Sequence, residues 1–179
     1  MRLQNVLVIL ALTCNPLLAQ GFRICVDDRV GVDDIARESF EKEMEVLLKG
    51  TDISYDPSPC LLPLPAGFIR LTILPAPPQN RKQALGLAHL SQSRVLPLLE
   101  VYVGRLYQYL EHPRTPYVIG RAMARVTVHE LTHYLRQDAG HDEHGFMQPK
   151  LAHWMLADPD PERFRLARSS PPESMSTRP

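Results

Sequence analysis

Two histidines separated by three residues form the most chemically suggestive pattern in the chain. In His129-Glu130-Leu131-Thr132-His133 the two imidazoles lie one turn apart on one helix face, so both can reach a single ion. Glu130 is rotated by about 100° from His129, so its carboxylate points beside the metal rather than at it. The pattern predicts a zinc (Zn2+) site with Glu130 as general base, because zinc activates water and polarises a carbonyl.

A catalytic zinc usually has three protein ligands and one water molecule, so a third ligand is needed. The candidates are His141 and His144, which follow the pair directly. Gly140 allows a sharp reversal of the chain, which favours His141. We interpret His144 as a solvated loop histidine or a partner of a ligand. The other histidines lack supporting spacing and are expected at surface or packing positions: His89, His112 and His153.

A long helix must position the paired histidines, and its start is well marked. Thr115 is a favourable N-cap residue and Pro116 suits the first helical position, so we expect a helix from there to about Gln137. Around the pair, Val126 and Leu131 make the helix apolar. Unpaired histidines would be costly in that setting, which argues against a chance match.

The remaining patterns predict an α+β domain. Residues 32–49 have amphipathic helix spacing, with Asp33 or Asp34 as the cap. Residues 57–65 contain four prolines and are expected to form a loop. The candidate strands cover residues 22–26, 52–56, 68–74, 83–90 and 97–103, and further helices are expected to begin at 106–110 and to cover 150–156.

The first 20 residues have the pattern of a signal peptide. Arg2 precedes an apolar run at 6–12, which is too short to cross a bilayer as a helix, and Ala19 suits cleavage. A buried N-terminal helix and a lipid anchor at Cys14 are the alternatives. We therefore expect a secreted or periplasmic protein without a stable membrane anchor.

Export changes how the three cysteines are interpreted. Cys14 is removed with the signal peptide, which leaves Cys25 and Cys60 in an oxidising compartment, where we expect a disulfide. The alternative is two buried thiols that never meet. The mature domain is expected to cover 21–157, followed by a disordered tail at 158–179 that is rich in proline, serine and charged residues.

Composition narrows the class of partner. The chain has 179 residues, enough for one domain, and its 20 lysines and arginines balance its 20 aspartates and glutamates. No net field therefore favours nucleic acid or an anionic membrane. We therefore expect no nucleic-acid partner.

Residues 129–149, HELTHYLRQDAGHDEHGFMQP, resemble the zinc signature of metzincin metallopeptidases. Arg136 replaces the glycine of that signature, and the third histidine falls at His141 rather than at position 139. The segment is more similar to small exported bacterial proteins in which a third histidine follows the pair after eight residues and precedes glycine and methionine, here Gly145 and Met147. The resemblance implies a mixed sheet and zinc peptidase activity on a peptide or protein substrate, with Met147 in an apolar turn beneath the ligands. We expect the protein to be a monomer.

The same resemblance implies that the substrate lies antiparallel to an edge strand, for which the small residues of 84–88 leave room. A plain edge strand is the alternative for this segment. For the whole chain the alternatives are an exported, non-catalytic binding module stabilised by zinc, and a hydrolase of another amide such as a cell-wall peptide. Glu130 argues against the first, since a structural site needs no base, whereas His144 as a fourth ligand would favour it.

Overall fold

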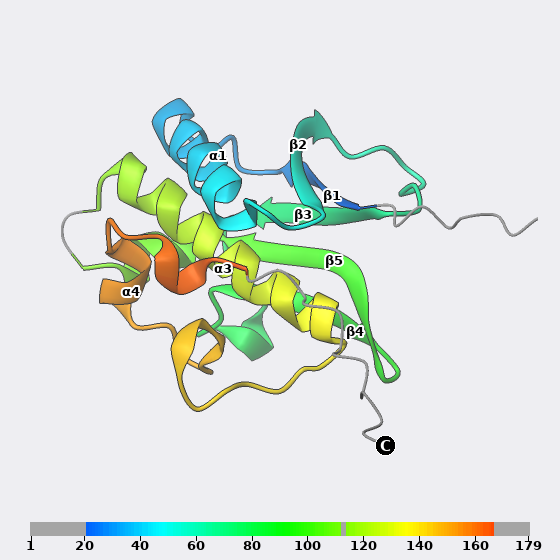
Figure 1. Cartoon of the computed structure of the whole chain (residues 1–179). Helices are drawn as coiled ribbons and strands as arrows, with labels where there is room; N and C mark the ends of the chain where they lie inside the picture. The colour runs from blue at the N-terminus through cyan, green and yellow to red at the C-terminus, as the bar shows by residue number, and fades with distance from the viewer. Residues whose placement is uncertain (1–20, 112–113, 167–179) are drawn as a thin grey trace, which may run out of the picture.

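The computed structural model describes residues 21–111 and 114–166. The predicted signal peptide, His112 and the predicted tail beyond residue 166 lie outside these ranges. The described chain has an α+β fold with a mixed five-stranded sheet and four α-helices (Figure 1). The predicted fold class is confirmed at this level.

The sheet has the strand order β2-β1-β3-β5-β4. Strands β2, β1, β3 and β5 run parallel to one another. Strand β4 is antiparallel to β5 and forms one edge of the sheet. The strands are β1 (Phe22–Asp28), β2 (Ile53–Pro59), β3 (Phe68–Leu74), β4 (Gly86–Ser91) and β5 (Arg94–Tyr102).

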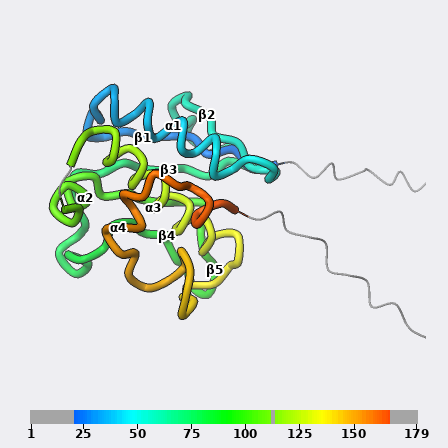
Figure 2. Tube along the Cα trace, turned by 60° about the vertical axis from the view of Figure 1, so that its left-hand side comes forward, coloured from blue at the N-terminus to red at the C-terminus, as the bar shows by residue number. Residues whose placement is uncertain are grey.

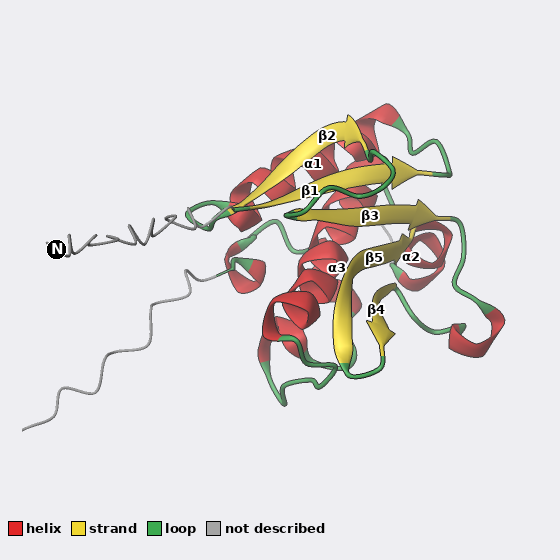
Figure 3. Cartoon of the chain, turned by 90° about the vertical axis from the view of Figure 1, so that its right-hand side faces the viewer, coloured by secondary structure: helices red, strands yellow, loops and turns green. Residues whose placement is uncertain are grey.

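Helices α1 (Asp34–Leu48) and α3 (Pro116–Arg136) pack against each other and cover one face of the sheet (Figure 3). Both begin as predicted: the Asp33 carboxylate accepts hydrogen bonds from the start of α1, and the Thr115 hydroxyl accepts one from the backbone of α3. Helix α2 (Val103–Tyr109) directly follows β5, and α4 (His153–Ala157) precedes the C-terminal part of the described chain.

The hydrophobic core lies between the sheet and these two helices. Ile69 and Leu71 of the central strand β3 are fully buried, together with Met44 from α1 and Val128 from α3. The core thus holds α3 against β4 and β5, and this fixes the height of the histidine pair above the edge of the sheet.

Several strand boundaries differ from the prediction. Strand β1 ends two residues later than expected, at Asp28, and β4 begins three residues later, at Gly86. Strand β2 continues through Pro57–Pro59, which we expected in a loop, because β2 is an edge strand and proline there loses no ladder hydrogen bond on its open side. Strand β5 begins at Arg94, three residues before the predicted start at Pro97.

The chain after α3 runs back along that helix to α4 (Figure 2). We call residues 137–152 the return segment. Its first residue, Gln137, has a left-handed φ of 52°, and its side-chain amide exchanges hydrogen bonds with the backbone of Val95 at 3.1 and 3.3 Å. The reversal that we expected at Gly140 therefore occurs at Gln137, where bonds to β5 offset the strained backbone.

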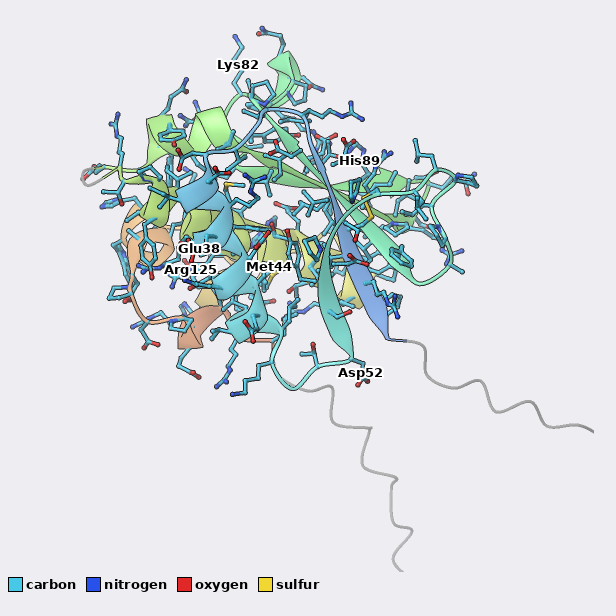
Figure 4. The ribbon with its side chains drawn as sticks, turned by 90° about the horizontal axis from the view of Figure 1, so that it is seen from above. Glu38, Met44, Asp52, Lys82, His89 and Arg125 are labelled. Carbon is cyan, nitrogen blue, oxygen red and sulfur yellow. A yellow bond between two sulfur atoms is a disulfide. The ribbon has the colours of Figure 1, made fainter. Side chains whose placement is uncertain are left out.

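The disordered tail that we expected from residue 158 onward does not begin there. Phe164 is fully buried, and the buried guanidinium of Arg125 lies over its ring, 5.2 Å from the centroid. Arg125 also donates to the Asp160 carbonyl at 3.1 Å and to the carboxylate of Glu43 in α1 at 2.8 Å. Figure 4 labels Arg125 beside this helix. A buried cation needs such partners, so the domain extends at least to Leu166.

Cys25 and Cys60 form the predicted disulfide, with their Cα atoms 5.1 Å apart. The bond ties β1 to the residue that follows β2. Among the described residues, no helix is both long enough and apolar enough to cross a membrane.

Replacing both Cys25 and Cys60 with alanine should lower the free energy of unfolding by about 3–4 kcal/mol, because the bridge closes a loop of 35 residues in the unfolded chain. Urea denaturation of the oxidised protein and of the double variant measures the difference. Adding reductant to the parent protein should have a similar effect, whereas the variant should not respond. Equal stability of the oxidised and reduced parent would contradict the prediction.

Candidate metal centre

Helix α3 and the return segment bring three histidines together. One ring nitrogen from each of His129, His133 and His141 lies within 4.8 Å of the other two. The ring centroids are 5.0 Å apart for the helical pair, and His141 lies 5.3 Å from His129 and 4.8 Å from His133. Small side-chain rotations would bring all three to one ion.

The return segment also orients the two helical imidazoles. His129 Nδ1 is 2.8 Å from the Phe146 carbonyl oxygen, and His133 Nδ1 is 2.8 Å from that of Asp138. A carbonyl only accepts, so each Nδ1 carries the hydrogen and each Nε2 keeps a free lone pair. This is the usual arrangement behind a metal-ligating histidine.

The environment favours the neutral form of His129 and His141, which is the form that binds a metal. Burial lowers the pKa of His129 to about 4, opposed by the hydrogen bond to Phe146 and reinforced by the other two histidines. The pKa of the more exposed His141 is also lowered, first by burial and then by His133. A donor set of three imidazoles suits zinc.

Glu130 lies between α3 and the edge strand β4. The backbone N–H of Ala88 hydrogen-bonds to its carboxyl group, and a Cβ atom added to Gly86 would lie 2.8 Å from Oε1. Burial raises the pKa of Glu130 to about 8, although the Ala88 hydrogen bond and the charge of Arg81 act in the opposite direction. The carboxyl is therefore held against β4, beside the histidines rather than among them.

Gly86 also has a role that differs from the expected one. We expected the small residues of 84–88 to leave room for a peptide, yet the missing Cβ of Gly86 leaves room for α3. That atom would lie 2.6 Å from a methyl group of Val126, as well as close to Glu130. A glycine inside a predicted strand often marks such a close approach, so Gly86 is the sequence signal that could have indicated the contact with α3.

A cleft of about 780 Å³ runs between α3, β4 and the return segment. The three histidines and Glu130 line it together with residues 84–88, whose outer side is the antiparallel edge of the sheet. Across from β4, Leu151 accepts a 2.8 Å hydrogen bond from the hydroxyl of Tyr109. The cleft therefore contains a possible base, three possible ligands and an unpaired strand edge.

Met147 is buried in a short 3-10 turn, Gly145–Met147, directly after the residue whose carbonyl holds His129. His144 caps this turn, is exposed and does not belong to the histidine cluster of the described residues. Its backbone position matches the expectation of a loop histidine.

The other described histidines and the tyrosine next to His133 lie outside the histidine cluster. His89 of β4 lies 2.8 Å from the carboxylate of Glu100 on β5. His153 is 3.6 Å from Glu111. The ring of Tyr134 on α3 packs edge-on against Phe22 with centroids 5.7 Å apart and does not line the cleft.

Comparisons with protein-family models, with curated proteins and with solved structures found no match to this chain.

Proposed function

We propose that the protein is an exported, metzincin-like zinc endopeptidase. The observation that carries the proposal is the cluster of His129, His133 and His141, two of them already oriented by carbonyl oxygens, beside the carboxyl of Glu130 in an open cleft. Three imidazole ligands would leave a position free for substrate, whereas a purely structural site usually closes with a fourth ligand.

Zinc in this cluster would lower the pKa of water and polarise the carbonyl of the peptide to be cleaved. The Glu130 carboxylate would accept the proton of the attacking water and then deliver it to the nitrogen of the leaving amine. His129 and His133 would hold the ion in place, with their Nδ1 protons fixed on Phe146 and Asp138.

The open edge of β4 would bind the peptide backbone as an added antiparallel strand. Glu130 touches Gly86 and Ala88 of this strand, so a peptide bound there would pass directly in front of the base. The disulfide is compatible with an exported protein, and we propose that the enzyme works as a monomer in the periplasm or outside the cell.

Metal removal tests this proposal. Protein stripped with a chelator should not hydrolyse a degenerate peptide library, and one equivalent of zinc should restore hydrolysis. Mass spectrometry of the products measures cleavage, and metal analysis measures the zinc content. A stripped protein that cleaves as fast as the reloaded one would rule out a zinc peptidase.

A further inference from the structure

Positive side chains line one part of the cleft. Arg81, Arg105 and Lys150 are all in its wall, whereas Glu130 is the sole carboxylate there. They come from three separate parts of the chain: a 3-10 turn at Gln79–Arg81, helix α2 and the return segment. The cleft is thus basic although the whole chain carries no net charge.

None of these three cations is held in a salt bridge within residues 21–111 and 114–166, although the charge of Arg81 also acts on Glu130. Six other arginines of these ranges do form salt bridges. An unpaired cation that lines a cleft is available to an anionic group of a ligand.

Arg105 is the best positioned of the three. Its Nη2 donates to the Gln83 side chain at 2.6 Å, and its guanidinium lies 5.8 Å from the ring centroid of Tyr109. These contacts restrict the side chain, and because its Nε is buried, a ligand can meet only the terminal nitrogens of the guanidinium. A restrained guanidinium that forms no salt bridge is well suited to bind a carboxylate.

The strand direction decides which part of a peptide would meet these cations. A peptide antiparallel to β4 runs from the Ser91 end toward Gly86, and its reacting bond lies near Glu130. The residues after that bond continue toward 81–85. Here the Tyr102 N–H donates to the Leu85 carbonyl at 2.9 Å, which joins this segment to the start of α2.

We infer that the cleft selects peptides with an acidic side chain within the first three residues after the cleaved bond. Arg105 is the main specificity-determining residue, and Arg81 and Lys150 add to the positive field. The inference rests on the proposed peptidase function and on its antiparallel substrate, and it adds a substrate class to them.

Cleavage-site profiling tests the inference. The zinc-loaded protein is incubated with a degenerate peptide library, and the new N-termini are sequenced. Aspartate and glutamate should be enriched about tenfold at one of the first three positions, as expected for one charge-assisted hydrogen bond. Arg105→Gln should remove most of the enrichment, and Lys150→Gln, at an exposed position, should reduce it partly. Lys49→Gln removes an equal charge after α1, outside the cleft, and should leave the profile unchanged.

A binding measurement separates this inference from the proposed function. Fluorescence anisotropy with the zinc-loaded Glu130→Gln protein compares two labelled alanine-rich peptides that differ only in a Glu-Glu or a Gln-Gln pair. The acidic peptide should bind about tenfold more tightly, and adding Arg105→Gln should remove most of this difference. Salt should reduce the difference.

The outcomes are distinct. Cleavage without acidic enrichment, or with enrichment that Arg105→Gln leaves intact, overturns the inference while the peptidase function stands. Tighter binding of the acidic peptide through Arg105 without cleavage by the parent protein supports the inferred ligand class and refutes the peptidase function. Equal binding of both peptides without any cleavage overturns the inference as well.

Discussion

Glu130→Gln is expected to lower the kcat/KM of peptide hydrolysis by at least about 10²–10⁴-fold, because it removes the group that moves the proton between water and the leaving amine. Glutamine has nearly the same size, so it fits the space beside Gly86 and can still accept the hydrogen bond from Ala88. The fold and the zinc content should therefore remain those of the parent protein.

Steady-state kinetics, circular dichroism and metal analysis on the same samples measure these three properties. The matched control is Glu143→Gln, which makes the same change at an exposed position in the return segment and should leave kcat/KM unaltered. Peptide hydrolysis by zinc-loaded Glu130→Gln at the parent rate would show the proposed mechanism to be wrong. If the parent itself binds zinc tightly without hydrolysing any peptide, the zinc-stabilised binding module becomes the better description.

The second large effect is expected in zinc affinity. Changing only the partner of a metal ligand typically weakens binding by about 10–100-fold, so removing a ligand itself should cost more than about 100-fold. His133→Ala and His141→Ala should both show such a loss. His144→Ala should bind zinc nearly as well as the parent, because His144 lies outside the cluster of the three rings.

Competition with a chromophoric chelator measures these affinities, and His153→Ala controls for the loss of an imidazole that does not line the cleft. Equal losses for His141→Ala and His144→Ala would indicate four protein ligands. No position would then remain for substrate, and the structural site would replace the catalytic one. Unchanged zinc affinity in His133→Ala would refute the ligand assignment altogether.

The local elements around the site could be predicted because their signals are close together in the sequence. Thr115 and Pro116 mark the start of α3, and the structure confirms both the cap and the helix. The spacing of His129 and His133 places both on one face of that helix in any fold. The apolar pattern of 68–74 likewise predicted the central strand with its observed bounds.

The contacts between distant segments could not be predicted in this way. Nothing in the sequence indicates that the carbonyls of Phe146 and Asp138 hold the histidine rings, because any residue offers a carbonyl. The left-handed conformation of Gln137 depends on its bonds to Val95, 42 positions away. Composition places Phe164 in the predicted tail. Its burial against Arg125 depends on a contact between segments that are distant in the sequence, which composition does not reveal.

The sequence by itself therefore determined the helix, the paired histidines with their neighbouring glutamate, and the two cysteines that form the bridge. Only the tertiary structure decided how His141 reaches the pair, why Gly86 must lack a side chain, and that Arg81, Arg105 and Lys150 share one cleft. The physical reason is the range of the interactions. Helix caps and periodicity act over a few residues, whereas the cleft is assembled from segments that the core brings together.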